Sequence, residues 1–116
     1  MKKKINVKLS HIHIVEVTDT YIRFNDDSMI TFDHAQDCCE YNYADFEQLD
    51  DIARNYNFQT PLQFEAIDHA GFRFGDGRAM FFIPCYSSQN GYYTADIDIY
   101  YNNQCQLSFT CEEDFY

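Results

Sequence analysis

Residues 92–101 read Tyr-Tyr-Thr-Ala-Asp-Ile-Asp-Ile-Tyr-Tyr, and this stretch has the clearest structural pattern in the chain. Side chains alternate between the two faces of a strand, so every second residue lies on the same face. One face of the predicted strand carries Ala95, Ile97, Ile99 and Tyr101, and the other carries Asp96, Asp98 and Tyr100. The alternation predicts a strand that is buried on one face and open to water on the other.

The same alternation recurs on both sides of this stretch. Asn102-Asn103-Gln104 is typical of a turn, and it leads into a second predicted strand at 105–111. Further strands are predicted at 5–9, 11–17, 21–24, 29–32, 63–68, 72–75 and 78–83. Asn25-Asp26-Asp27-Ser28 predicts a hairpin turn, and residues 84–91 predict a polar loop.

One segment has helical spacing instead. Phe46, Leu49, Ile52 and Ala53 form an apolar stripe that predicts a helix from about residue 45 to residue 56. The 116 residues fit one compact domain, residues 1–116, and contain no linker or repeat. The expected fold class is α+β: a mainly antiparallel twisted sheet with one packed helix.

Negative charge dominates the composition. The chain has 19 acidic and 8 basic residues, and four of the basic ones are Lys2, Lys3, Lys4 and Lys8. Residues 9–116 therefore have a net charge of -15, which argues against binding to phosphate backbones. The start lacks the apolar core of a signal peptide, and no apolar run is long enough to span a membrane, so we expect a cytoplasmic protein.

Two interpretations of this acidity stay open. The carboxylates either keep an ordinary surface soluble, or they imitate phosphates and occupy the basic nucleic-acid channel of a partner protein. In the second case the partner-binding residues are expected on the exposed side of the predicted helix, namely Glu47, Asp50 and Asp51.

The five cysteines raise the question of a metal. Cys105 and Cys111 are about 20 Å apart on one predicted strand at about 3.4 Å per residue, so they cannot share one ion. Cys111 lies at the end of its hairpin that the loop containing Cys85 approaches. The candidate ligands of a structural zinc are His34, Cys38, Cys39, Cys85 and Cys111. Thiolates favour zinc over magnesium or calcium, although simply buried thiols would account for the same cysteines.

Catalysis is not expected. A thiol nucleophile needs an activating histidine and an orienting acid, and proximity of Cys39, His34 and Asp37 in sequence does not establish that geometry. The glycine-containing stretch 71–77 predicts a hairpin turn and not a phosphate-binding loop. A closed structural zinc also leaves no coordination position for a substrate.

Residues 34–41, His-Ala-Gln-Asp-Cys-Cys-Glu-Tyr, together with residues 84–93, resemble small phage and prophage proteins that carry an Asp-Cys-Cys-Glu signature. In size and acidity the chain also resembles, as a class, the anti-CRISPR proteins that inhibit Cas9 in type II systems. These resemblances imply a binding inhibitor in the host bacterial cytoplasm with no catalytic residues, stabilised by zinc, that blocks DNA loading on a Cas9-type nuclease. A zinc-stabilised binding module with another partner is the alternative.

Overall fold

The structure is a computed structural model that describes residues 11–33, 41–88, 96–110 and 112–114. Five strands form a first sheet in the order β11-β10-β4-β3-β2, with antiparallel neighbours throughout. They are β2 (Ile14–Val17), β3 (Tyr21–Phe24), β4 (Met29–Asp33), β10 (Asp96–Tyr101) and β11 (Gln104–Thr110). The predicted strands at 21–24 and 29–32 and the turn between them are confirmed.

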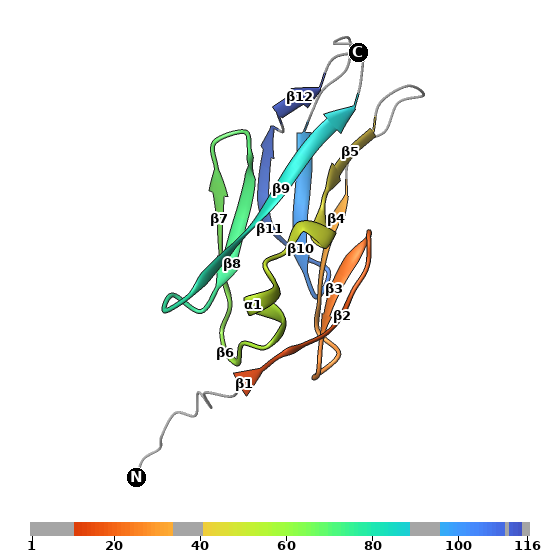
Figure 1. Cartoon of the computed structure of the whole chain (residues 1–116). Helices are drawn as coiled ribbons and strands as arrows, with labels where there is room; N and C mark the ends of the chain where they lie inside the picture. The colour runs from red at the N-terminus through yellow and green to blue at the C-terminus, as the bar shows by residue number, and fades with distance from the viewer. Residues whose placement is uncertain (1–10, 34–40, 89–95, 111, 115–116) are drawn as a thin grey trace.

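A second sheet faces the first (Figure 1). Its strands follow the order β12-β9-β8-β7, and β5 pairs with β9 as well. They are β5 (Tyr41–Ala44), β7 (Gln63–Ile67), β8 (Gly71–Gly75), β9 (Met80–Ser88) and β12 (Glu112–Asp114). Only β12 runs parallel to its neighbour within this described sheet. The short strands β1 (His11–Ile12) and β6 (Phe58–Gln59) pair with each other.

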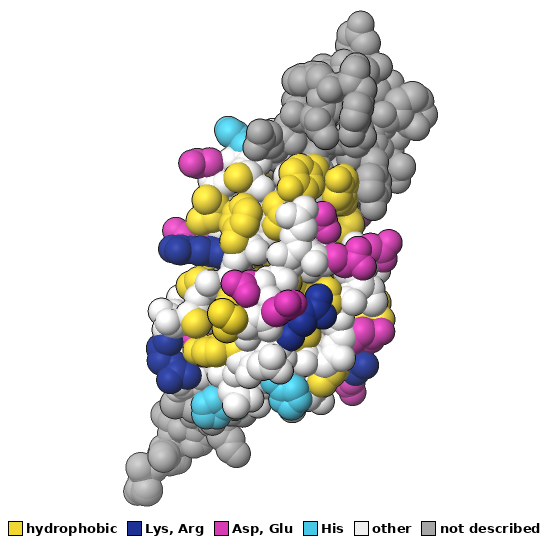
Figure 2. All heavy atoms as spheres, viewed as in Figure 1, with side chains coloured by type: hydrophobic (Ala, Val, Ile, Leu, Met, Phe, Trp, Pro, Cys, Tyr) yellow, Lys and Arg dark blue, Asp and Glu magenta, His cyan; other side chains and the backbone are white. Residues whose placement is uncertain are grey.

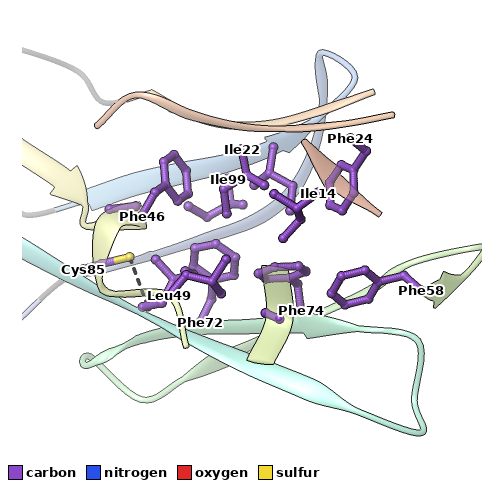
Figure 3. Packing of buried hydrophobic residues seen from close by; sticks show 14 of the residues in the cluster. Ile14, Ile22, Phe24, Phe46, Leu49, Phe58, Phe72, Phe74, Cys85 and Ile99 are labelled. Carbon is purple, nitrogen blue, oxygen red and sulfur yellow. Dashed lines mark hydrogen bonds between the residues drawn. The ribbon is translucent and has the colours of Figure 1, made fainter. Parts of the chain in front are cut away.

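The hydrophobic core fills the space between the two sheets (Figure 3). Phe72 and Phe74 project from β8 toward Ile22 and Ile99 on the opposite sheet, and all four are fully buried. The ring centroids of Phe24 and Phe74 lie 6.5 Å apart with nearly perpendicular planes, an arrangement that aromatic pairs prefer. Ile97 and Ile99 are fully buried too, so the face assignment of the predicted strand is correct.

The predicted helix at 45–56 is wrong in its extent. The segment forms a 3₁₀ turn, η1 (Phe46–Gln48), and a single-turn helix, α1 (Asp51–Arg54). Asp50 separates them because its backbone is extended, while its side chain accepts a hydrogen bond from the Ile52 N–H at 3.0 Å and caps α1. The two short turns bury Phe46, Leu49 and Ala53 of the apolar stripe, whereas the fourth member, Ile52, is 66% exposed.

The predicted loop at 84–91 is wrong for its first five residues. β9 continues through Ser88 because β5 pairs with its second half from Cys85 to Ser88, and β12 pairs with Tyr86 to Ser88. The antiparallel α+β class is confirmed, with its strands divided between two facing sheets instead of one. In the described part of the chain, no helix is long and apolar enough to cross a membrane.

Candidate functional site

The residues predicted to bind a partner lie on the connection between β5 and β6. Glu47 is in η1, and Asp50 and Asp51 begin α1; all three are exposed. Asp51 lies 3.6 Å from the guanidinium of Arg54, which offsets part of its charge. On the face seen in Figure 2, acidic side chains are dispersed among polar and hydrophobic ones, with basic side chains beside several of them. The structure groups the three residues on one segment without forming a continuous acidic stripe there.

The predicted zinc ligands fall mostly outside the described residues: His34, Cys38, Cys39 and Cys111. The same holds for Asp37, which together with His34 and Cys39 formed the possible catalytic group. Cys85 is described, and it lies within β9 and not in a loop. Its side chain is fully buried in the hydrophobic core, where Sγ donates a hydrogen bond to the Ile83 carbonyl at 3.8 Å.

These surroundings suit a small apolar core residue, the alternative that the sequence left open. The described ranges contain no group of three His, Cys, Asp or Glu side chains placed to hold a metal ion. The predicted zinc site therefore stays a prediction.

The arginines are held by the chain's own carboxylates. The ion pairs are Arg23 with Glu16 and Asp27, Arg54 with Asp51, Arg73 with Glu65, and Arg78 with Asp76. The described residues contain 17 acidic side chains against these four arginines, a net charge of -13. The charge that the described surface offers to a partner is therefore negative.

A concentration of carboxylates that sequence reasoning missed lies on the outer face of the first sheet. Asp98 of β10 is the register partner of Asp33 at the end of β4, so both side chains project from the same face. Asp96 lies on that face two residues before Asp98, and Tyr100 two residues after it. We call Asp33, Asp96, Asp98 and Tyr100 the acidic face.

Hydroxyl groups on the neighbouring strand β11 orient two of these carboxylates. Ser108 Oγ donates to Asp98 Oδ1 at 2.6 Å, and Thr110 Oγ1 donates to Asp96 Oδ1 at 2.8 Å. A neutral hydroxyl leaves the carboxylate its full negative charge. These two hydroxyl contacts therefore orient Asp96 and Asp98 without neutralising them.

An open hollow of about 340 Å³ adjoins the acidic face. Its lining residues are Thr31, Phe32, Asp33, Tyr100 and Asn103. Burial raises the pKa of the Tyr100 hydroxyl, and the charges of Asp98 and Asp33 raise it further. The phenol therefore stays neutral at physiological pH, and a cation beside it would be attracted by both carboxylates.

The alternation in 92–101 did place Asp96, Asp98 and Tyr100 on one face. The pairing of β10 with β4 could not be predicted from the sequence. This pairing brings Asp33 beside Asp98, which is 65 residues further along the chain. Comparisons of the chain with protein-family models, with curated proteins and with solved structures found no match.

Proposed function

We propose that this protein is a non-catalytic inhibitor that binds a basic, nucleic-acid-guided nuclease and prevents DNA from loading. A Cas9-type enzyme in the host bacterial cytoplasm is the target that the resemblances imply. The observation that carries the proposal is the net charge of -13 over the described residues, whose four arginines are already paired with carboxylates of the same chain. Such a surface attracts a Lys/Arg-rich channel and competes there with the phosphates of DNA.

The scaffold supports this mode of action because it holds its charges in fixed positions. Fully buried aromatic and aliphatic side chains from both sheets lock the strands together. A partner then meets carboxylates that are already placed, and less conformational entropy is lost on binding.

A pull-down with a purified Cas9-type nuclease and its guide RNA, followed by a DNA cleavage assay, tests the proposal. We expect stoichiometric capture and loss of cleavage, with affinity falling as salt is raised because the attraction is electrostatic. No capture together with full cleavage would end the proposal and leave the binding module with another partner.

Variants of the predicted partner-binding residues need care, because Asp50 also caps α1. Asp50→Ser keeps a capping hydroxyl while it removes the charge, and it can be combined with Glu47→Lys and Asp51→Lys. We expect weaker nuclease binding, with the larger loss at low salt. Equal affinities of the triple variant and the unaltered protein would remove these three residues from the interface.

Structural zinc is a separate part of the proposal. Its support is topological: Tyr41, which directly follows segment 34–40, pairs with Ser88, and Glu112 pairs with Tyr86. Strands adjoining two of the candidate segments therefore lie along β9, which itself contains Cys85. Metal analysis of protein purified without chelators should give one zinc per chain in the unaltered protein and in Cys105→Ser, whose cysteine is exposed. Zinc retained in Cys85→Ser would exclude Cys85 as a ligand, and zinc absent from all three proteins would exclude the site.

A further inference from the structure

The outward side chains of β9 form an apolar surface on the second sheet. Ile83 is fully buried in the core, so by alternation Phe82, Pro84 and Tyr86 project from the opposite face of the strand. We call these three residues, together with Met80, the β9 face. Phe82 is 42% exposed, and the other members are partly exposed. A contiguous apolar surface marks a site of protein binding more often than a single exposed apolar residue does.

The neighbouring strand β8 leaves the Phe82 ring uncovered. Arg73 is the register partner of Phe82, but its Nε donates to Glu65 on β7 at 2.6 Å, which draws the guanidinium away from the ring. The two diagonal neighbours on β8 are Gly71 and Gly75, which have no side chain to lay over the ring. A Cβ atom at either position would lie within 2.1 Å of a backbone carbonyl oxygen, so the close pairing of the strands requires glycine at both.

Negative charge lies on both sides of the β9 face. On one side the Tyr86 hydroxyl accepts from Gln48 Nε2 at 3.4 Å, which holds η1 and its exposed Glu47 beside β9. On the other side are Glu65 of β7 and the exposed Asp68 in the turn that follows it. Figure 2 shows this side of the molecule, where hydrophobic side chains gather on the upper half and acidic side chains lie to either side of them.

We propose that the β9 face binds an apolar side chain of a basic protein partner, whose lysine or arginine side chains lie opposite the acidic margins. The inference rests on the proposed function, because it names the surface through which the same partner is recognised. An apolar centre with a charged rim is the usual arrangement of a protein interface, in which the centre contributes most of the affinity.

Charge complementarity favours a basic partner over a second copy of this chain. The described residues have a net charge of -13, and pairing two β9 faces would bring their acidic margins close together. Like charges placed opposite each other across an interface oppose binding, whereas basic groups of a partner would be attracted by both margins.

Calorimetric titration of the full chain with three eight-residue peptides tests the inference. The first alternates leucine with lysine, the second serine with lysine, and the third leucine with glutamate. We expect the leucine–lysine peptide to bind at least about tenfold more tightly than either of the others, because only it matches both the apolar centre and the acidic margins. Equal affinities of the leucine–lysine peptide and one of the others would overturn the inference.

Variants locate the binding surface. Phe82→Ser should lower affinity for the leucine–lysine peptide about tenfold, and Met80→Ser on the same face should lower it several-fold. The matched control is Val15→Ser, which removes a side chain that is 46% exposed on β2 of the first sheet and should cost less than about threefold. Similar losses in Phe82→Ser and Val15→Ser would overturn the inference. Circular dichroism and urea unfolding establish that each variant is folded.

The margins and the choice of partner are tested in the same way. Glu47→Gln combined with Asp68→Asn should weaken leucine–lysine binding several-fold at low salt and much less in about 1 M salt. An unchanged affinity at low salt would overturn the assignment to a basic partner. Sedimentation should show a monomer, and self-association that is lost in Phe82→Ser would overturn the inference in favour of a second copy.

The nuclease assay separates this inference from the proposed function. If Phe82→Ser combined with Met80→Ser inhibits cleavage as strongly as the unaltered protein, the inference fails and the proposed function stands. If the unaltered protein binds the leucine–lysine peptide through the β9 face but does not bind the nuclease, the proposed function fails and the inference stands.

Discussion

Asp76 and the acidic face show two opposite uses of a carboxylate. The Asp76 side chain is 1% exposed and accepts from the N–H groups of Gln59 and Ala79 at 3.0 and 3.1 Å. Tyr56 donates its hydroxyl at 2.9 Å, which ties the end of α1 to the β8–β9 turn. On the acidic face, Asp33 and Asp98 oppose each other at the surface. The carboxylate of Asp76 is buried and stabilises the fold through its hydrogen bonds, whereas Asp33 and Asp98 are carboxylates at the surface whose like charges oppose each other.

The largest effect on stability is expected from substitution of Asp76. Asp76→Ala removes a buried carboxylate and leaves three partly buried donors without their acceptor, so it should lower the free energy of unfolding by about 3 kcal/mol. Urea denaturation at neutral pH measures this change. Asp19→Ala, at an exposed position, is the control and should change stability by less than about 0.5 kcal/mol. Similar losses in the two variants would contradict the structural role of Asp76.

Lowering the pH should remove the stabilisation that the ionised Asp76 side chain gives to the folded state. Burial alone would raise the pKa of Asp76, but hydrogen bonds from Gln59, Ala79, Tyr56 and Arg78 hold that pKa well below its usual range. Between this pKa and the unfolded value of about 3.9, the unfolded chain binds more protons, so stability rises with pH. The stabilisation by Asp76 is complete above about pH 5 and declines as the pH falls through about 4.

The measurement is urea unfolding between neutral pH and strong acid, for the unaltered protein and for Asp76→Asn. The difference in unfolding free energy should be constant at neutral pH and shrink in acid, because asparagine does not titrate. A difference that stays constant into strong acid would mean that the Asp76 pKa is not lowered in the folded state.

Local sequence patterns predicted several of the described strands because one face of those strands is buried, although the predicted strand at 11–17 is divided at His13 into β1 and β2. The predicted strand at 5–9 lies outside the described residues. Ile12 and Ile14 are buried and His11 and His13 are exposed, as alternation requires. The turn after β10 could also be predicted, since Asn102 and Asn103 both have positive φ, which asparagine tolerates better than most residues. Such features depend on residues that are close together in the sequence.

Features that depend on distant contacts could not be predicted in this way. The helical stripe at 45–56 is satisfied by two short turns, because Asp50 caps a new turn and Phe46 packs against Phe32 of the opposite sheet. Cys85 has the sequence context of a polar loop, yet pairing with Ala44 keeps it in a buried strand. The acidic face likewise exists only because β10 pairs with β4.

The smallest effect on stability is expected from substitution of Asp98 on the acidic face. Asp98→Asn keeps a side chain that can bond to Ser108 and removes one of two opposed charges, so it should raise the free energy of unfolding by about 0.5 kcal/mol. Urea denaturation at low salt measures the gain. The gain should fade in about 1 M salt, where the Debye length is about 3 Å.

A double-mutant cycle with Asp33→Asn is the control. Once one charge is removed, removing the other should bring little further gain, because the repulsion needs both. Additive gains would mean that the two carboxylates act independently, and a loss of stability in Asp98→Asn would mean that the fold uses this charge as it uses that of Asp76. A gain in stability would show that this pair of opposed carboxylates is maintained at a cost to the fold, which is expected of a surface under selection for binding.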